Sequence, residues 1–200
     1  MLVPDDDYEQ ASFVDEEFGS PSAGGGLFID CTFSRCSLGD VKMRKWRFTS
    51  CVLRDCQFVA ADLGEMGWLD TTLERCVLAG VQLFGSGLRH ATFRDCKLDS
   101  VNFRAAALTD VVFADCVLRD TDFGGARLTG IAFPGSTVVA ADLSKATCKD
   151  VDLRGARLGD DTRPGIKAGY DCLRGVTIDG LQLVQLAPLL ATQLGLRIDG

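Results

Sequence analysis

The chain has 200 residues, 46% of them apolar, which is enough for one domain with a sizeable core. Its 28 acids and 21 bases give a net charge of −7, which disfavours a general nucleic-acid-binding protein. No apolar run approaches the roughly 18 residues of a transmembrane helix, so we expect no membrane contact.

The first 25 residues form an acidic segment. They carry seven acids and no Lys or Arg, so they account for the whole net charge, because the other 175 residues hold 21 acids and 21 bases. The start MLVPDDDYEQ has acids where a signal peptide needs a basic and then an apolar stretch, so we expect a cytoplasmic protein. Tyr8, Phe13 and Phe18 are spaced by five. The segment 1–25 is therefore predicted to be an imperfect first copy of the unit that follows, or a tail.

Residues 26–160 repeat with a period of five. Starting at Phe28, every fifth residue up to Leu158 is apolar, and 23 of these 27 positions are Leu or Phe. A second series of small or apolar residues lies two positions before each of these centres, and all 34 charged residues occupy the other three places. A period of five fits neither a helix nor a simple strand. It requires a short extended segment and a turn, repeated and stacked into a solenoid.

Identical residues recur at a spacing of twenty, which sets the size of one coil. The recurring cysteines are Cys36, Cys56, Cys76, Cys96 and Cys116. Phe93, Phe113 and Phe133 follow the same spacing. Four units of five per coil imply a square cross-section with nearly seven coils. At about 4.8 Å between stacked strands, such a rod is roughly 33 Å long.

The units AADLG, AADLS, VDLRG and TDFGG resemble the A(D/N)LXX motif of pentapeptide-repeat proteins. The resemblance implies an all-β solenoid, a right-handed quadrilateral β-helix, over at least residues 26–160. It is specific for the fold and far less so for function.

The C-terminal part departs from the repeat. GDDTRPGIKAGYD breaks the pattern and then Leu173, Ile178 and Leu183 resume it, so 161–183 is predicted to be a distorted face and a last coil. In 184–200, Pro188 suits the first turn of a short helix and Gly195 its end. Its apolar residues are Leu186, Leu189, Leu190 and Leu194. They need a cover, and the alternatives are a cap over the solenoid core and a contact between two copies.

Both chain ends resemble the Qnr and MfpA type of quinolone-resistance proteins and their albicidin- and microcin-resistance relatives. The residues that carry this resemblance are ASFVDEEF with FIDCTFSRCSL at the start, and LRGVTIDGLQL with LGLRIDG at the end. The resemblance implies a homodimer joined through the C-terminal helix, with Leu186, Leu189, Leu190 and Leu194 at the contact. It also implies a DNA mimic that binds DNA gyrase or topoisomerase IV and protects it from poisons.

An outward acidic surface is the predicted binding site for that partner. Its residues are Asp62, Asp110, Asp115, Asp120, Asp122 and Asp142. One alternative is an interaction scaffold for some other protein. Another is direct nucleic-acid binding through the basic stretch KMRKWRF, which we do not expect because the rest of the surface gives no net attraction.

Other chemistry has little support in the sequence. The spacing C-x4-C occurs twice, but neighbouring units lie on different faces and the ladder predicts these sulfurs as core, so we expect no metal site. His90 is the single histidine, and no motif places a nucleophile beside it. We therefore expect no cofactor and no catalytic activity.

Overall fold

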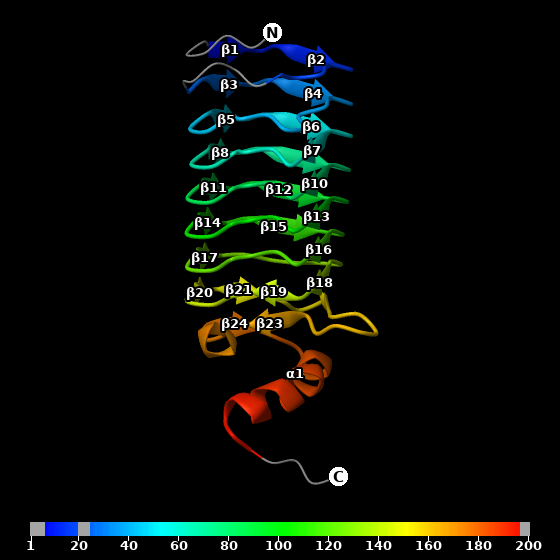
Figure 1. Ribbon diagram of the computed structural model, residues 1–200, viewed down its shortest axis with the longest axis vertical. Helices are drawn as coiled ribbons and strands as arrows, with labels where there is room; N and C mark the ends of the chain where they lie inside the picture. The colour runs from blue at the N-terminus through cyan, green and yellow to red at the C-terminus, as the bar shows by residue number, and fades with distance from the viewer. Residues whose placement is uncertain (1–6, 20–24, 197–200) are drawn as a thin grey trace.

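The computed structural model describes residues 7–19 and 25–196, and in these ranges the chain winds into a rod of stacked coils (Figure 1). Each regular coil takes 20 residues, because strands pair in parallel at that offset: Phe93 with Phe113, and Leu108 with Leu128. The molecule is a parallel β-solenoid of about seven turns with one short C-terminal helix. The predicted fold class is thereby confirmed.

The rod has four faces, numbered here 1 to 4 in chain order within a coil. Face 1 is an eight-stranded sheet of β1 Asp7–Glu9, β3 Leu27–Ile29, β5 Arg47–Thr49, β8 Gly67–Leu69, β11 Gly87–Arg89, β14 Ala107–Thr109, β17 Arg127–Thr129 and β20 Thr147–Lys149. Face 2 contains β2 Ser12–Val14, β4 Thr32–Ser34, β6 Val52–Arg54, β9 Thr72–Glu74, β12 Thr92–Arg94 and β15 Val112–Ala114, continued by β21 Val151–Asp152 and β24 Val176–Thr177. The three-residue strands leave room for only one inward centre each.

Faces 3 and 4 complete the square. Face 3 consists of β7 Gln57–Val59, β10 Val77–Ala79, β13 Lys97–Asp99, β16 Val117–Arg119, β18 Thr137–Val139 and β22 Arg157–Leu158. Face 4 is held mainly by single bridges, one per coil, from Lys42–Asp62 to Asp122–Asp142. It ends in the pair β19 Ala141–Asp142 and β23 Ile166–Ala168.

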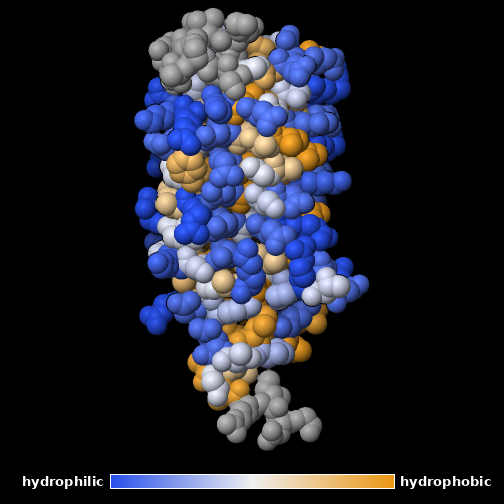
Figure 2. Space-filling view, viewed as in Figure 1, coloured by the Kyte–Doolittle hydropathy of each residue, from blue (hydrophilic) through white to orange (hydrophobic). Residues whose placement is uncertain are grey.

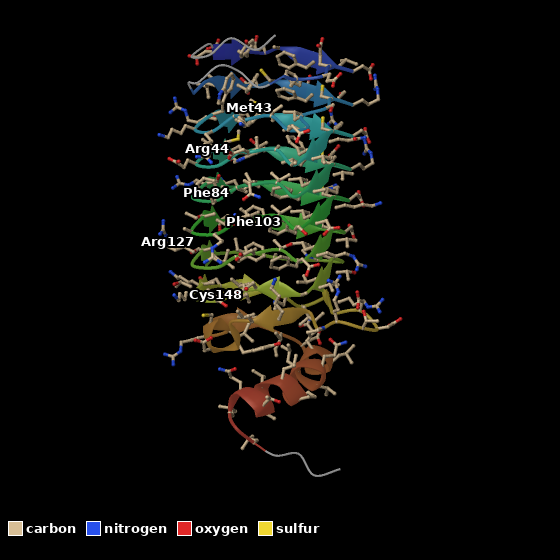
Figure 3. The ribbon with its side chains drawn as sticks, viewed as in Figure 1. Met43, Arg44, Phe84, Phe103, Arg127 and Cys148 are labelled. Carbon is tan, nitrogen blue, oxygen red and sulfur yellow. The ribbon has the colours of Figure 1, made fainter. Side chains whose placement is uncertain are left out.

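The core consists of the two apolar series predicted from the period of five. Centres from successive coils stack on one another, with ring centroids 4.9 Å apart for Phe93 and Phe113 and 5.2 Å for Phe103 and Phe123. Met43 and Phe103 point into this interior, whereas charged side chains point outward (Figure 3). Within the described residues, the buried polar side chains belong to Thr71, Ser86, Thr121, Ser136 and Gln182, none of them charged.

The edges between faces have left-handed backbone. From Gln10 to Asp150, the non-glycine residues with positive φ all lie at such edges, at intervals that are multiples of five residues. Their φ values are between 50° and 64°. Asp tolerates this conformation better than most residues, because its short side chain makes local hydrogen bonds. Ten of the 22 non-glycine residues with positive φ are Asp. Many acids on this rod therefore have a conformational reason to be where they are.

The N-terminal residues within the described ranges form a first coil. Asp7 pairs with Leu27 and Ser12 with Thr32, in the same register as the coils below. Tyr8 stacks on Phe28 with ring centroids 5.0 Å apart. Residues 1–6 and 20–24 of the predicted acidic segment lie outside the described residues.

The last coil is five residues longer than the others. Val138 pairs with Leu158 at the regular offset of 20, but Val151 pairs with Val176 at an offset of 25. The additional residues form a loop at 159–165 that projects beside face 3 (Figure 1). Since the insertion equals one repeat, the five-residue phase is kept, and Leu173 and Ile178 still pack against the core.

The helix begins earlier than predicted. Helix α1 Gly180–Gln193 follows η1 Tyr170–Cys172 and has Pro188 in its interior instead of its first turn. Asp179 and Gln182 form a capping box that fixes the start at Gly180. Leu183 is therefore an exposed helical residue and not the inward centre of a last coil, as the sequence had suggested. In the described parts of the chain, no helix is long and apolar enough to cross a membrane.

Candidate functional site

Three of the six predicted acids, Asp62, Asp122 and Asp142, lie in one row along face 4. Each carboxylate accepts a hydrogen bond from the backbone N–H two residues later, 2.7 Å from Gly124 N to Asp122 Oδ1 and 2.9 Å from Ser144 N to Asp142 Oδ1. Such bonds stabilise the turn at the end of face 4. These acids therefore shape the backbone of the face as well as contributing charge.

Two of these three acids are neutralised by arginines of the preceding coil. Arg44 Nε lies 2.8 Å from Asp62 Oδ2, and Arg104 Nη1 lies 3.1 Å from Asp122 Oδ2. Arg44 also covers the ring of Phe84 at 5.0 Å (Figure 3). Face 4 therefore does not present the row of free carboxylates that the sequence suggested.

The other three acids, Asp110, Asp115 and Asp120, lie at three different edges of one coil. They have φ values of 52°, 53° and 50° and follow faces 1, 2 and 3 in turn. A single flat partner therefore cannot contact all three. The structure thus places three of the six predicted acids along face 4 and the other three at successive edges of one coil.

Asp120 belongs to a network that holds the projecting loop. Arg163 Nη1 lies 2.7 Å from Asp120 Oδ2, and Arg119 Nη1 lies 3.2 Å from Asp160 Oδ2. Hydrogen bonds from the Thr162 backbone N–H and hydroxyl and from the Arg163 backbone N–H lower the pKa of Asp160 to about 2. These contacts assign Asp120 a role in positioning the loop.

A row of acids that the sequence analysis missed follows the edge between faces 1 and 2. We call Asp30, Asp70, Asp110 and Asp150 the acidic edge. All four are exposed and occupy the same corner position in alternate coils. In the sequence these four acids are spaced by forty residues. They do not form a series at the coil spacing of twenty, because His90 and other residues occupy the same corner position in the coils between them.

His90 connects two members of the acidic edge. Its Nδ1 is 3.1 Å from Asp70 Oδ1 and its Nε2 is 3.6 Å from Asp110 Oδ2. About half of each of these side chains is exposed. The prediction of an outward His90 agrees with this position, and no Ser or Cys is hydrogen-bonded to its ring in the described chain.

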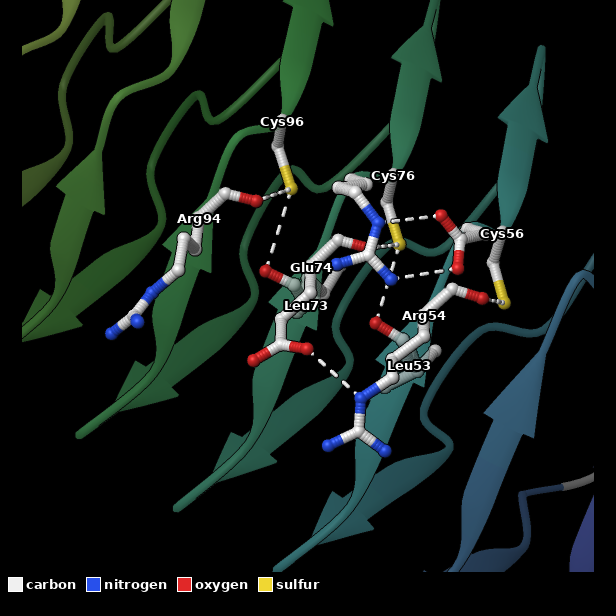
Figure 4. A network of polar contacts seen from close by, with 10 residues as sticks. Leu53, Arg54, Cys56, Leu73, Glu74, Cys76, Arg94 and Cys96 are labelled. Carbon is white, nitrogen blue, oxygen red and sulfur yellow. Dashed lines mark hydrogen bonds and ion pairs between the residues drawn. The ribbon is translucent and has the colours of Figure 1, made fainter.

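Seven of the nine cysteines are buried core residues whose thiols donate to backbone carbonyls, as Figure 4 shows for Cys76 and Cys96. Cys76 Sγ donates to Leu53 O and Glu74 O at 3.4 Å, and Cys96 Sγ donates to Leu73 O at 3.4 Å. Hydrogen bonding between neighbouring thiols, together with burial, raises the pKa of Cys76 and of Cys116. Burial raises the pKa of Cys51 to about 11. Burial and raised pKa values make the thiols of Cys51, Cys76 and Cys116 unsuited to nucleophilic chemistry.

The basic stretch KMRKWRF, where the second coil passes into the third, is divided between face 4, an edge and face 1. Trp46 is fully buried, so it is not available to stack on a base. Lys45 Nζ lies 3.8 Å from Glu65 Oε2 in the next coil. In the described ranges, no group of three His, Cys, Asp or Glu side chains is arranged to hold a metal ion.

The four leucines predicted at a dimer contact divide between the two sides of α1. Leu186 is 2% exposed and packs on the end of the core, Leu190 is half-buried against the same core, and Leu189 is also half-buried. Only Leu194 is fully exposed. Leu186 therefore caps its own rod and is not available to a second copy, which corrects the sequence-based assignment.

A different set of apolar residues is uncovered on α1 and just after it. We call Leu181, Leu183, Val184, Leu194 and Leu196 the apolar helix side. Their side chains are 53–74% exposed. Figure 2 shows hydrophilic columns along the visible side of the rod, with hydrophobic residues between them and around the C-terminal end.

Comparison with known families agrees with this geometry. The family model described as a pentapeptide repeat region matches residues 67–143. The same register of twenty residues continues on both sides of this part of the chain. Among curated proteins, none matches the chain.

Several solved structures share this architecture. A trypsin-treated variant of QnrB1, a plasmid-mediated fluoroquinolone resistance protein, is 21% identical over 96% of this chain and 100% of its own, with a TM-score of 0.38. HetL, involved in heterocyst differentiation regulation in the cyanobacterium Nostoc sp. strain PCC 7120, is 15% identical over 88% and 90%, with a TM-score of 0.47. Rfr23 from the cyanobacterium Cyanothece 51142 is 15% identical over 86% and 88%, with a TM-score of 0.30. QnrB1 and HetL have different roles, so the likeness carries no assignment of function.

Proposed function

We propose that this protein is a non-enzymatic DNA mimic that binds DNA gyrase or topoisomerase IV and protects it from quinolone-like or natural-product poisons. The partner comes from the resemblance of both chain ends to Qnr and MfpA-type proteins. The structural observation that supports it is the acidic edge, a straight row of exposed carboxylates along a rigid rod.

The dimensions of the rod suit this role. The eight strands of face 1 stack at about 4.8 Å, which gives roughly 34 Å. Duplex DNA of that length contains about ten base pairs at 3.4 Å each. Carboxylates of the acidic edge recur every second coil, about 10 Å apart, and therefore present negative charge at regular intervals along the rod axis.

The chemistry of the described side chains supports a binding protein. The buried cysteines are hydrogen-bonded to carbonyls, and His90 is placed between two carboxylates and not beside a nucleophile.

A second copy is proposed to cover the apolar helix side. Val184 and Leu181 are 69% and 70% exposed, and their burial against the same residues of a partner copy removes apolar surface from water. A twofold contact at this end extends the rod to about twice its length. Substitution of Val184 by Asp is expected to convert the dimer to a monomer in gel filtration. Gln185→Asp, at an exposed polar position of the same helix, is the control that keeps the dimer.

The protection itself is tested with purified gyrase in a supercoiling assay and a poison-stabilised cleavage assay. The wild-type protein is expected to reduce cleavage in the presence of a fluoroquinolone. The double variant Asp70→Asn with Asp110→Asn is expected to lose most of this effect, since Asn keeps the left-handed backbone and removes the charge. If the wild type neither inhibits supercoiling nor reduces cleavage, the proposed function is wrong.

A matched control uses two acids of the neighbouring edge. The variant Asp95→Asn with Asp115→Asn removes the same charge from exposed corner positions between faces 2 and 3. It is expected to protect gyrase nearly as well as the wild type. Equal loss in both double variants would mean that net charge, and not the acidic edge, carries the interaction.

A further inference from the structure

A shallow groove runs along the outer side of face 1, which the proposed function does not use. It has a volume of about 490 Å³ and extends over five coils, from Leu27 to Thr109. Its floor lies over the row Gly67, Gly87 and Ala107 in consecutive coils. The outward row two residues later, which includes Leu69 and Arg89, carries larger side chains and forms one wall of the groove.

The fold does not require glycine at the centre of this groove. Gly87 lies in strand β11 without positive φ, and a Cβ atom built there would meet no atom within 4 Å. Glycine weakens a strand and often marks a place where another chain or a ligand approaches closely. Since neither a turn nor packing explains Gly87, its position is consistent with keeping the groove open.

The outward positions of face 1 carry unpaired positive charge. From β3 to β20 these positions hold four cations and no acid. The cations are Arg47, Arg89, Arg127 and Lys149. All four are exposed, and within the described residues none of them makes an ion pair, whereas nine other arginines of the rod and its loop do.

The surroundings of the groove favour a narrow anionic chain over a nucleic acid. A three-residue strand makes the face only about 10 Å wide. The acidic edge follows it directly, so a wide polyanion such as a duplex would approach those carboxylates. The aromatic centres of face 1, Phe48 and Trp68, are buried and face the core, which leaves no exposed ring for stacking single-stranded bases.

We propose that face 1 binds an extended acidic peptide segment of a partner protein. The segment lies along the rod axis, with apolar side chains over Gly87 and Ala107 and carboxylates paired with Arg47 and Arg89. The stem of Arg47 itself lies over Gly67, where an added Cβ atom would be 3.1 Å from Arg47 Cγ. Five coils span about 19 Å, the length of roughly six extended residues. This inference is independent of the topoisomerase role, because it uses the opposite charge and a different surface.

The binding test uses a fluorescein-labelled peptide of eight alternating Glu and Leu residues, titrated with the full chain at low salt and followed by anisotropy. A peptide with Gln in place of Glu measures the part of the affinity that depends on charge. The acidic peptide is expected to bind at least about tenfold more tightly than the Gln peptide. That ratio of affinities corresponds to the contribution of one strong charge-assisted hydrogen bond.

Two variants test the location. Gly87→Leu fills the groove without changing charge and is expected to weaken binding at least tenfold while leaving the circular dichroism spectrum intact. Arg47→Glu with Arg89→Glu is expected to have an effect of similar size. Arg94→Glu with Lys97→Glu makes the same charge change at unpaired cations on faces 2 and 3, and is expected to alter affinity less than threefold.

Three results would overturn the proposal. The first is unchanged peptide affinity in Gly87→Leu, and the second is an equal loss in the two charge-reversal pairs. The third is tighter, face-1-dependent binding of a single-stranded oligodeoxythymidine of the same charge, which would assign the face to nucleic acid instead. None of these measurements involves gyrase, so their failure and the failure of the proposed function are distinguishable.

Discussion

The middle of the rod and its C-terminal end are built from the same repeat but are stabilised differently. In the middle, each centre stacks on an identical or similar residue in the coils on both sides, as Phe113 does on Phe93 and Phe133 at 4.9 and 5.2 Å. At the end, Cys148 occupies a centre position, and a dry apolar cavity of about 30 Å³ lies beside it. A repeat stabilises itself only where it has neighbours, and its last coil depends on contacts that do not repeat.

The sharpest way to test this difference is to remove one large side chain from each region. Phe113→Ala deletes a fully buried ring between two others and is expected to lower the free energy of unfolding by about 3–5 kcal/mol. Leu158 is a centre residue of the last coil and is 6% exposed. Leu158→Ala is expected to lower the free energy of unfolding by about 2 kcal/mol, near the lower end for such changes. Urea unfolding followed by circular dichroism measures both. A larger loss for Leu158→Ala would contradict the comparison.

The cap depends on one buried polar side chain. Gln182 is 2% exposed, and its Nε2 donates to the carbonyl oxygens of Leu153 and Ala156. Gln182→Leu keeps the volume but leaves the Ala156 carbonyl without a donor, while the Leu153 carbonyl keeps only the Ala156 N–H, so it is expected to destabilise the end by about 1–3 kcal/mol. Hydrogen exchange is expected to show faster exchange in α1 and the last coil, with the middle coils unchanged. Uniform acceleration along the rod would show that the two regions unfold as one unit.

Filling the cavity beside Cys148 is expected to raise the free energy of unfolding, whereas the substitutions above lower it. Cys148→Leu places at this centre the residue type found at Leu128 in the preceding coil, and is expected to raise the free energy of unfolding by about 1 kcal/mol. Cys116→Leu is the control, because it inserts the same side chain at a fully packed small position and is expected to destabilise by about 1–3 kcal/mol. Thermal unfolding of the two variants separates these outcomes, and a stabilised Cys116→Leu would argue against tight packing in the middle.

The smallest expected effect concerns the projecting loop and pH. The folded pKa of Asp160 is about 2, below the ordinary value near 4 for Asp, so the ionised carboxylate stabilises the loop. This contribution is complete above pH 4 to 5 and is lost as the pH falls toward 2. Amide NMR shifts of Thr162 and Arg163 are expected to titrate in that window, and Asp160→Asn to abolish the titration. A midpoint near 4 would mean that these hydrogen bonds do not form in solution.

The sequence was sufficient to predict the architecture because the period of five leaves few alternatives. Only a stacked coil buries both apolar series at once, so residues such as Phe113 and Cys116 could be placed inside from spacing alone. The same argument correctly put Asp115 outside, because charge is excluded from the two inward places.

The surface could not be predicted in the same way. An outward Asp looks identical in the sequence whether it pairs with an Arg of the preceding coil, as Asp62 does with Arg44, or remains free. Pairing depends on which edge or face a residue shares with its neighbours twenty positions away. Likewise, Pro188 suggested a helix start, but the capping box at Asp179 and the packing of Leu186 continue the helix across the proline.

The insertion in the last coil has a consequence for the length of the molecule. The pairing offset is 20 throughout the regular coils and 25 only where residues 159–165 project. Within the paired strands, an insertion that is not a multiple of five residues would turn inward residues outward. A further coil takes 20 residues, so the rod lengthens in steps of about 4.8 Å. The number of coils therefore sets the length of the rod. A variant lacking residues 87–106 keeps the inward residues of the remaining coils in register and is one coil shorter.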